Sequence, residues 1–512
     1  MCNPFASERR ALALALVLVA CATIVRLAVL FVTPVELYPD EAQYWVWSRD
    51  LAWGYFSKPP MVAWLIAATT AIGGDSEAWV RISSVMLHGV APLFMFATAQ
   101  RLYGPREALL TVAIYSLMPG VQLSAGIAST DAPLLFFLSG ALWAYVRLLE
   151  APPTRLARAA WGAAVGLFLG LACLSKYAAV YFIVGLIVHG LVSAQARRAW
   201  RPIALTAAVS VLALMVAPNF GWNAHNGFAT FAHTARNADW SATSFLHVDE
   251  VFDFLASQLG VFGPVPFVAL AIGTFLAFRR PLATGPDKLL LVLTLPPLCA
   301  VAIEALLSRA NANWAFTAYV PGSILAAAWL VRWRARWWTL GGLAVQAGVA
   351  VLFLACVVQP SLADALGLAN SLKRARGWRV TADAILDRAQ AEPTLSAVAV
   401  DNRFVFNELR YYGRERLART GAPPIRMWVR EALPLNQAEM QAPLTGAVGG
   451  RVMAVSRTPE FRTDFVRDFT RATARPLVSI RLDRLRTRDL TIFIAEGYWR
   501  RPRDPITGLP RP

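Results

Sequence analysis

The chain has 512 residues, of which 57% are hydrophobic and 16% are charged, and its mean hydropathy is +0.47. Soluble proteins carry about 25% charged residues, so this composition excludes an ordinary soluble enzyme. The five cysteines lie far apart without a CxxC or Cys/His spacing, which argues against a disulfide framework or a zinc cluster. The net charge of +17 would suit a nucleic-acid partner, and its meaning depends on where the charge lies.

Apolar segments make up most of the first 360 residues. A helix needs about 20 mostly apolar residues to span a bilayer. Eleven segments come close to this length: 11–33, 80–100, 107–127, 131–149, 159–175, 177–195, 202–220, 251–278, 289–307, 314–331 and 337–358. A shorter apolar run at 60–72 begins at a Pro-Pro pair and ends at a Gly-Gly pair, so we expect a helix lying at the membrane interface.

The first segment has an alternative interpretation as a signal peptide. Arg9 and Arg10 precede the apolar run, and Ala20-Cys21-Ala22 resembles a cleavage site. The run continues to Val32, which is longer than the apolar part of a signal peptide. We therefore predict a membrane span.

Basic residues are distributed unevenly over the loops between the spans. With a cytoplasmic N-terminus, the loops on that side contain sixteen Lys and Arg residues from Arg9 to Arg336. The opposite loops contain six: Arg49, Lys58, Arg81, Lys176, Arg236 and Arg309. Because basic loops stay in the cytoplasm, the positive charge is mostly a topology signal and does not indicate nucleic acid. Eleven spans then place residues 361–512 outside the cytoplasm.

The C-terminal part, 361–512, is Arg-rich and has no segment long enough to cross a bilayer. Helical periodicity extends from Asn370 to Gln390, and strand-length apolar runs follow at Leu395–Val400, Arg451–Ser456, Leu477–Leu482 and Leu490–Ala495. We predict a transmembrane domain over 1–360, with an external loop at 34–79 that carries interface helices, and a small extracytoplasmic α/β domain over 361–512. The arginines of this domain are either a solvated surface or a surface that attracts anionic lipid or an acidic acceptor.

Polar side chains that a membrane protein does not need for folding collect on the predicted external face. They come from five turns: the Asp40-Glu41 pair with Tyr55 and Lys58, Asp131, Lys176, Asn223 with His225, and Asn313. Each has a structural alternative, because Asp caps helices, Lys reaches to the interface from apolar surfaces, and Asn, His and Trp anchor helix ends. Their convergence on one face favours a site for a charged headgroup.

A resemblance joins these motifs. The stretch Tyr38 to Pro60 resembles the first external loop of glycosyltransferase family 39 and its bacterial relatives, which include the lipid A aminoarabinose transferases. The later motifs Ser129–Pro133, Leu174–Tyr177, Trp222–Ala224 and Asn313–Pro321 follow in the family's order. The resemblance covers roughly residues 10–330. It implies a GT-C type inner-membrane enzyme of bacteria that transfers a hexose or pentose, with inversion, from a polyprenyl-phosphate carrier to an acceptor outside the cytoplasm.

The residues support this chemistry independently. An acceptor hydroxyl needs a carboxylate within hydrogen-bond reach to remove its proton, and we assign this role to Asp40, with Glu41 and Asp131 as further catalytic candidates. The leaving lipid phosphate needs cations or polar donors, for which Lys58, Lys176 and Tyr55 are candidates. Weaker candidates for substrate binding are Asn223, His225, Arg236 and Asn313.

Several alternatives stay open. The family's aminoarabinose transferases have an acid before the loop lysine, whereas Ser57 stands here, so no metal or other cofactor is predicted, although a divalent metal is compatible with the family. A transporter or flippase of lipid-linked or anionic substrates is the main rival, since intramembrane charges such as Arg26 and Glu304 mark substrate paths. A receptor or scaffold would leave the Asp-Glu and Lys-Pro-Pro loop unexplained. Membrane lipids are expected partners, and the acceptor is lipid A or core saccharide, another glycan, or a protein.

Overall fold

The computed structural model describes residues 4–238, 246–279, 285–392, 394–419, 421–505 and 507–511. The chain folds into two compact units. The first, which we call the membrane unit, comprises Met1–Val32, Ala52–Gly54 and Lys58–Ala355. The second, the sheet unit, comprises Thr33–Leu51, Tyr55–Ser57 and Cys356–Pro512. Residues of the predicted first external loop, 34–79, are therefore divided between the two units.

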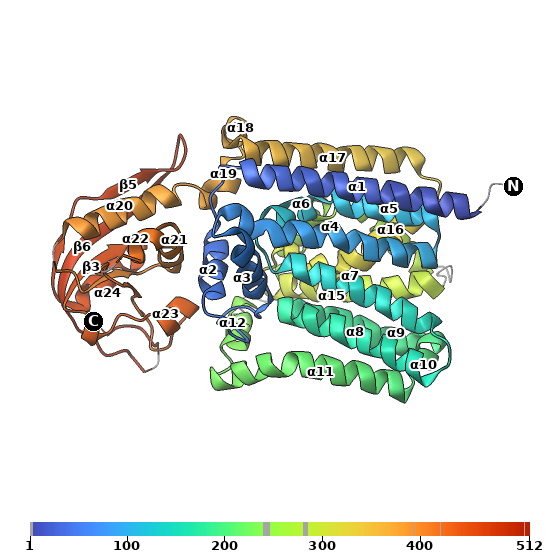
Figure 1. Ribbon diagram of the computed structural model, residues 1–512, viewed down its shortest axis with the longest axis horizontal. Helices are drawn as coiled ribbons and strands as arrows, with labels where there is room; N and C mark the ends of the chain where they lie inside the picture. The colour runs from blue at the N-terminus through green and yellow to red at the C-terminus, as the bar shows by residue number, and fades with distance from the viewer. Residues whose placement is uncertain are drawn as a thin grey trace. The chain divides into compact units, whose positions relative to one another are not determined.

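The membrane unit is helical, and most of its long helices run side by side in Figure 1. Its α-helices are α1 (Pro4–Val32), α3 (Met61–Gly73), α4 (Glu77–Leu102), α5 (Pro105–Leu117), α6 (Pro119–Gly126), α7 (Asp131–Glu150), α8 (Arg155–Ser175), α9 (Val180–Val192), α10 (Ala194–Ala199), α11 (Pro202–His225), α12 (Ala229–Ala238), α13 (Val248–Val261), α14 (Pro264–Arg279), α15 (Gly285–Leu307), α16 (Tyr319–Arg332) and α17 (Arg336–Val358). Two 3-10 helices, η1 (Tyr177–Ala179) and η2 (Ala312–Ala318), precede α9 and α16. Helix α3 lies crosswise to the long helices.

Eight of the described helices are long and apolar enough to cross a membrane, or nine if α5 and α6 form one bent span. Three predicted spans differ from this set. The segment 107–127 bends by 55° between α5 and α6, because Pro119 has no N–H to continue the helix. The segment 251–278 is interrupted at Gly263, whose φ is 101°, and 177–195 yields the 13-residue α9. The multi-span helical fold is confirmed, and the count of eleven is not.

Arg26 of α1 stabilises the bend between α5 and α6. Its guanidinium is buried, and Nη2 donates to the Ser116 carbonyl at 2.6 Å and to Oε1 of Gln122 at 3.2 Å. The Ser116 carbonyl lies just before Pro119, where the regular helical pattern of hydrogen bonds is interrupted. The buried Arg26 therefore has a structural role, because it donates a hydrogen bond to a backbone carbonyl where the helix is interrupted. Its position in the membrane is no longer evidence for a substrate path.

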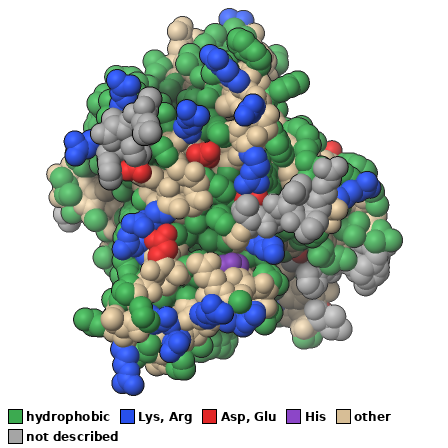
Figure 2. Space-filling view, turned by 90° about the vertical axis from the view of Figure 1, so that its right-hand side faces the viewer, with side chains coloured by type: hydrophobic (Ala, Val, Ile, Leu, Met, Phe, Trp, Pro, Cys, Tyr) green, Lys and Arg blue, Asp and Glu red, His purple; other side chains and the backbone are tan. Residues whose placement is uncertain are grey.

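One end of the membrane unit is basic. Figure 2 views the unit from the end at which α1 begins, and lysine and arginine side chains are more frequent there than acidic ones. At this end Asp287 of α15 accepts hydrogen bonds from Tyr103 and from both terminal nitrogens of Arg332, at 2.6–3.0 Å. Helix α7 runs opposite to α8 and α11, so the start of α7 and the ends of α8 and α11 lie at the opposite end.

The sheet unit contains a six-stranded sheet in the order β2-β1-β3-β6-β4, with β5 also paired to β6. The strands are β1 (Ala397–Val400), β2 (Ile425–Met427), β3 (Arg451–Ser456), β4 (Phe469–Ala474), β5 (Val478–Arg481) and β6 (Thr487–Tyr498). The pairs β2–β1 and β1–β3 are parallel, and β6 pairs antiparallel with β3, β4 and β5. Its helices are α2 (Pro39–Ser48), α18 (Pro360–Ala365), α19 (Ala369–Leu372), α20 (Trp378–Ala391), α21 (Arg403–Tyr412), α22 (Arg414–Leu417), α23 (Gln437–Gln441) and α24 (Pro459–Arg467), and its 3-10 helices are η3 (Lys373–Ala375) and η4 (Gly446–Val448).

Alternate residues of β1 build two hydrophobic cores. Val398 and Val400 pack with α20 and α21, while Ala397 and Ala399 face a second core that contains Phe465 of α24. All four predicted strands are present, as β1, β3, β5 and β6, and the α/β class of this part is confirmed. The short β2 and the largely exposed β4 were not predicted, because neither has an apolar run.

The predicted helix from Asn370 to Gln390 is wrong at its start. The structure breaks it into α19, η3 and α20. Gly377 lies at the break with φ 73°, a left-handed conformation that glycine adopts at little cost. A Cβ atom there would also lie 2.8 Å from the side chain of Leu482. The helical periodicity continues across this glycine, so the periodicity alone did not reveal the break.

The first external loop contributes α2 to the sheet unit. Trp45 packs edge-to-face against Tyr411 of α21, with ring centroids 5.0 Å apart. The Leu37 N–H donates to the Tyr412 hydroxyl, and the Phe56 N–H donates to Oε1 of Gln437 at 2.7 Å. These partners are more than 350 residues away in the chain, so the conformation of α2 depends on the C-terminal part of the sequence.

Candidate active site

Three predicted residues meet in the membrane unit. Asp131 begins α7, Lys176 follows the last residue of α8, and Asn313 lies in η2. Lys176 Nζ is 2.7 Å from Asp131 Oδ1, and Asn313 Nδ2 donates to Asp131 Oδ2 at 3.0 Å. The side chains of Asp131 and Lys176 are 9% and 17% exposed. The acid, the amine and the amide therefore form one nearly buried cluster in which both oxygens of Asp131 have partners.

A second polar group lies where α8 and α11 end. The Tyr177 hydroxyl donates to Oδ1 of Asn219 at 2.9 Å, and Nδ2 of Asn223 donates to the same hydroxyl at 3.2 Å. Oδ1 of Asn223 accepts the Thr230 N–H, so Asn223 is buried and fully engaged. Asn219 was not among the predicted residues, although a second asparagine one turn before Asn223 in an apolar helix is a recognisable signal.

Asn219 also holds part of the first external loop. Its Nδ2 donates to the Trp53 carbonyl at 2.7 Å. Gly54 follows, and a Cβ atom at this glycine would lie 2.6 Å from the ring of Trp222 and 2.9 Å from Asn219. The close approach of the loop to α11 therefore requires glycine at position 54.

The Asp40-Glu41 pair separates into one exposed and one buried acid. The Glu41 carboxylate accepts the Tyr38 N–H at 2.9 Å and is 1% exposed, so it closes the first turn of α2. Asp40 is 60% exposed, and its Oδ1 lies 3.8 Å from Nη2 of Arg403 in α21. Arg403, which also donates to Gln43, was not predicted, because no local pattern links it to the first loop.

Tyr55 and Lys58, the two other candidates in the first external loop, lie in different units. Tyr55 is fully buried and stacks on Trp47 at 4.6 Å, and its hydroxyl donates to backbone carbonyls of Trp47 and Asp50. This hydroxyl serves the fold of the loop, and its role in phosphate binding stays a prediction. Lys58 is half-buried and belongs to the membrane unit, just before α3.

The two remaining candidates, His225 and Arg236, are exposed. His225 is exposed at the end of α11, and its Nδ1 lies 3.0 Å from the Gly221 carbonyl of the same helix. Arg236 is exposed on α12. Within the described parts of the chain, no group of three His, Cys, Asp or Glu side chains could hold a metal ion. Of the predicted site residues, the structure brings Asp131, Lys176 and Asn313 together.

Comparisons with known proteins bear on this arrangement. The family model for dolichyl-phosphate-mannose-protein mannosyltransferases matches residues 57–222. The lipid A galacturonosyltransferase RgtD of Rhizobium johnstonii is 33% identical over 464 residues, which cover 89% of this chain and 91% of that protein. The chain belongs to this family of membrane glycosyltransferases. An undecaprenyl phosphate-alpha-4-amino-4-deoxy-L-arabinose arabinosyl transferase of Pseudomonas aeruginosa is 28% identical over 193 residues, or 35% of this chain and 34% of that one.

The fold agrees with the family. The crystal structure of ArnT from Cupriavidus metallidurans bound to undecaprenyl phosphate superimposes with a TM-score of 0.66. The match covers 93% of this chain and 97% of that one at 19% identity. The predicted GT-C fold and the prediction of a glycosyltransferase are thus confirmed, and nothing in these matches supports a transporter.

Proposed function

We propose that the enzyme transfers a sugar from a polyprenyl-phosphate carrier to lipid A, at the periplasmic face of the bacterial inner membrane. The match along 91% of a lipid A galacturonosyltransferase carries this proposal. The ArnT of the same fold, crystallised with undecaprenyl phosphate, supports the lipid-phosphate class of donor. A basic end of the membrane unit supports the orientation, because basic ends face the cytoplasm. The opposite end, with the Asp131 cluster, then faces the periplasm.

The proposed reaction forms one bond and breaks one. The acceptor oxygen attacks the anomeric carbon, the bond from that carbon to the carrier phosphate breaks with inversion, and the acceptor proton moves to a carboxylate. Asp40 is the proposed base because its carboxylate is largely exposed, whereas Glu41 caps α2 and both oxygens of Asp131 are engaged. Positioned bases of this kind contribute roughly 10²–10⁴-fold to rate.

When the anomeric C–O bond breaks, its electron pair stays on the carrier phosphate, which gains a negative charge as it leaves. A cation that meets it at the membrane surface stabilises the transition state. Lys58, which is half-buried just before α3, is the proposed partner. The ammonium of Lys176 is paired with Asp131 at 2.7 Å. Lys176 and Asn313 then act as positioning residues, which hold the start of α7 against the end of α8.

The test compares lipid A and other envelope glycans by mass spectrometry, with and without the gene. We expect lipid A to lose one sugar increment, whose mass distinguishes a hexose, a hexuronic acid and an amino-pentose. Wild-type enzyme should restore the increment, and the Asp40→Asn variant should restore little of it at equal membrane abundance. An unchanged lipid A with a lost increment on another glycan or a protein would refute lipid A as the acceptor.

Two further measurements test the donor and the orientation. Purified enzyme should use a polyprenyl-phosphate sugar and should be inactive with a nucleotide sugar alone, and Lys58→Ala should raise the KM for the lipid donor as well as lower kcat. A reporter fused after Pro360 should be active only on the periplasmic side. Cytoplasmic activity of this fusion would reverse the assigned topology.

A further inference from the structure

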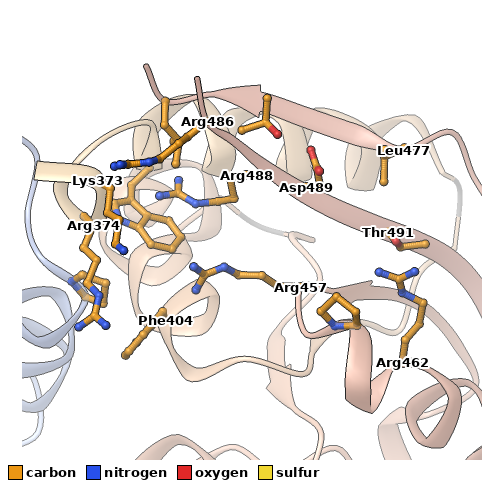
Figure 3. A pocket seen from close by; sticks show the side chains of 15 residues that line it. Lys373, Arg374, Phe404, Arg457, Arg462, Leu477, Arg486, Arg488, Asp489 and Thr491 are labelled. Carbon is orange, nitrogen blue, oxygen red and sulfur yellow. Dashed lines mark hydrogen bonds between the residues drawn. The ribbon is translucent and has the colours of Figure 1, made fainter. Parts of the chain in front are cut away.

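The sheet unit contains a pocket of about 780 Å³ that Figure 3 shows from close by. Its lining includes six basic side chains: Lys373, Arg374, Arg457, Arg462, Arg486 and Arg488. Asp489 is the one acidic residue among the lining residues. Ligand pockets measure about 300–1,000 Å³, so the volume suits a group of the size of a small saccharide. Such an excess of cations in a cavity favours an anionic ligand.

Two of the arginines in this pocket, Arg488 and Arg457, lie over the ring of Trp378. The guanidinium of Arg488 lies 3.4 Å from the centroid of the indole ring, and that of Arg457 lies 5.5 Å from it. Figure 3 shows Lys373, Arg374 and Arg486 on the same side of the view. Trp378 is 1% exposed, so its ring serves as a platform for the guanidiniums and is itself covered.

The Arg488 guanidinium lies close to other positive charges. Burial and the nearby charge of Arg457 lower its pKa to about 10, although Glu408 and Glu36 act in the opposite direction. The pKa of Arg457 is lowered by burial and by the charge of Arg374, although Asp401 and Glu408 act in the opposite direction. A bound anion would stabilise the charged form of both guanidiniums.

Hydrogen-bond donors remain available on these arginines. Arg488 donates through Nη1 to Thr381 and through Nη2 to the Arg376 carbonyl, so its position is fixed. Within the described residues, Nε of Arg488 and Nε of Arg462 are buried without a hydrogen-bond partner, and Nη1 of Arg486 has an ion pair with Asp483 at 3.7 Å but no hydrogen bond. Guanidinium N–H groups match the oxygens of phosphate in geometry and charge. The unsatisfied donors therefore favour a phosphate group over a neutral sugar.

The pocket is lined by the sequence neighbours of the proposed catalytic base and of its arginine partner. Pro39 and Phe404 line it, and each is adjacent in sequence to one member of the Asp40–Arg403 pair. Since the base removes a proton from the acceptor hydroxyl, a ligand that extends from this pocket to Asp40 is the acceptor and not the lipid-linked donor.

We propose that this basic pocket binds a phosphate group of the saccharide acceptor and so holds the acceptor hydroxyl near Asp40. The assignment of the ligand as the acceptor rests on the proposed function, whereas the phosphate class rests on the lining residues. Deacylated lipid A, a glucosamine disaccharide with two phosphates, is the soluble probe that carries this chemistry.

The experiment measures binding of three probes to the full-length protein in nanodiscs by titration calorimetry. The probes are the bisphosphorylated disaccharide, the same disaccharide after phosphatase treatment, and inorganic phosphate. The variants are Arg374→Gln and Arg486→Gln, whose side chains are accessible to solvent, singly and together. Arg471→Gln, an exposed arginine of β4 that does not line the pocket, is the matched control.

We expect the bisphosphorylated disaccharide to bind more tightly than either other probe. Each substitution in the pocket should weaken its binding about 10- to 100-fold, the effect of losing a charged hydrogen bond, and Arg471→Gln should leave it unchanged. Unchanged affinity in the double variant, or equal binding of the dephosphorylated probe, would overturn the proposal. If inorganic phosphate bound as tightly as the bisphosphorylated disaccharide, the claim that the ligand is a saccharide would be overturned. If binding behaves as expected but lipid A loses no sugar in cells without the gene, the proposed function fails and the phosphate-binding pocket remains.

Discussion

The Lys176–Asp131 pair provides a quantitative test of the cluster in the membrane unit. Two unit charges 2.7 Å apart attract each other by about 6 kcal/mol at an effective dielectric constant of about 20, and the cost of desolvating both charges offsets most of this. Lys176→Met removes one partner and leaves the Asp131 carboxylate 9% exposed with only Asn313 as a donor. Breaking a buried pair in this way costs about 3–5 kcal/mol.

A neutral double variant separates this cost from the loss of the pair itself. In Lys176→Met/Asp131→Asn no charge is left buried, so we expect its stability to lie within about 1–2 kcal/mol of the wild type. The pair Arg101–Glu150 has the same 2.7 Å separation but is 40% and 38% exposed. Arg101→Met should therefore cost at most about 1 kcal/mol.

The assay is the thermal midpoint of the full-length protein in one detergent, followed by fluorescence-detected size exclusion. Lys176→Met should melt several degrees below the wild type. The double variant and Arg101→Met should melt close to the wild type. A single variant as stable as the double variant would refute a buried, charged pair. Turnover adds a second readout, because a double variant that is stable yet inactive would show that the cluster also contributes to the reaction.

Three other predictions follow from individual residues. Asp40→Asn should lower turnover roughly 10²–10⁴-fold at an unchanged melting midpoint. Glu41→Gln should weaken the helix cap, which lowers the free energy of unfolding by about 1 kcal/mol and with it the melting midpoint, and should leave the turnover of folded enzyme largely intact. Asp287→Ala should cost about 1–3 kcal/mol because Tyr103 and the partly exposed Arg332 lose their acceptor, with activity per folded molecule unchanged. Burial raises the pKa of Glu439 from 4.5 to about 7, so the folded state holds this proton more tightly than the unfolded state and loses stability as pH rises from about 4.5 through 7. Between pH 4.5 and 8 the free energy of unfolding of the wild type should therefore fall by about 3 kcal/mol more than that of Glu439→Gln. Melting midpoints of both proteins at the two pH values check this.

The fold was predictable where it depends on composition and local pattern. Long apolar segments and uneven basic loops predict a multi-span helical unit with one basic end, and short apolar runs predict four of the six strands. The errors occur at single residues that change the backbone. Pro119, Gly263 and Gly377 interrupt stretches whose hydrophobicity or periodicity continues past them.

The candidate site was predictable in its residue types and less so in its partners. Asp131, Lys176 and Asn313 were selected as polar residues at turns on one face, and the structure joins them by two contacts. No local pattern predicts that Lys176 is paired with Asp131 and is not a lone cation. Ion pairs between residues 45 positions apart depend on how helices pack, and periodicity carries no information about packing partners.

The packing partners of the first external loop were also not predictable from its sequence. Its acidic pair looks symmetrical in the sequence, and only the packing of α2 against α21 buries Glu41 and exposes Asp40 beside Arg403. Because α2 belongs to the sheet unit, the residue proposed to act as the base takes its position from a part of the chain more than 350 residues away. The C-terminal sheet is therefore a structural support of the proposed reaction centre. Substitutions of buried α21 side chains such as Phe406 and Leu409 should accordingly affect turnover through the position of Asp40.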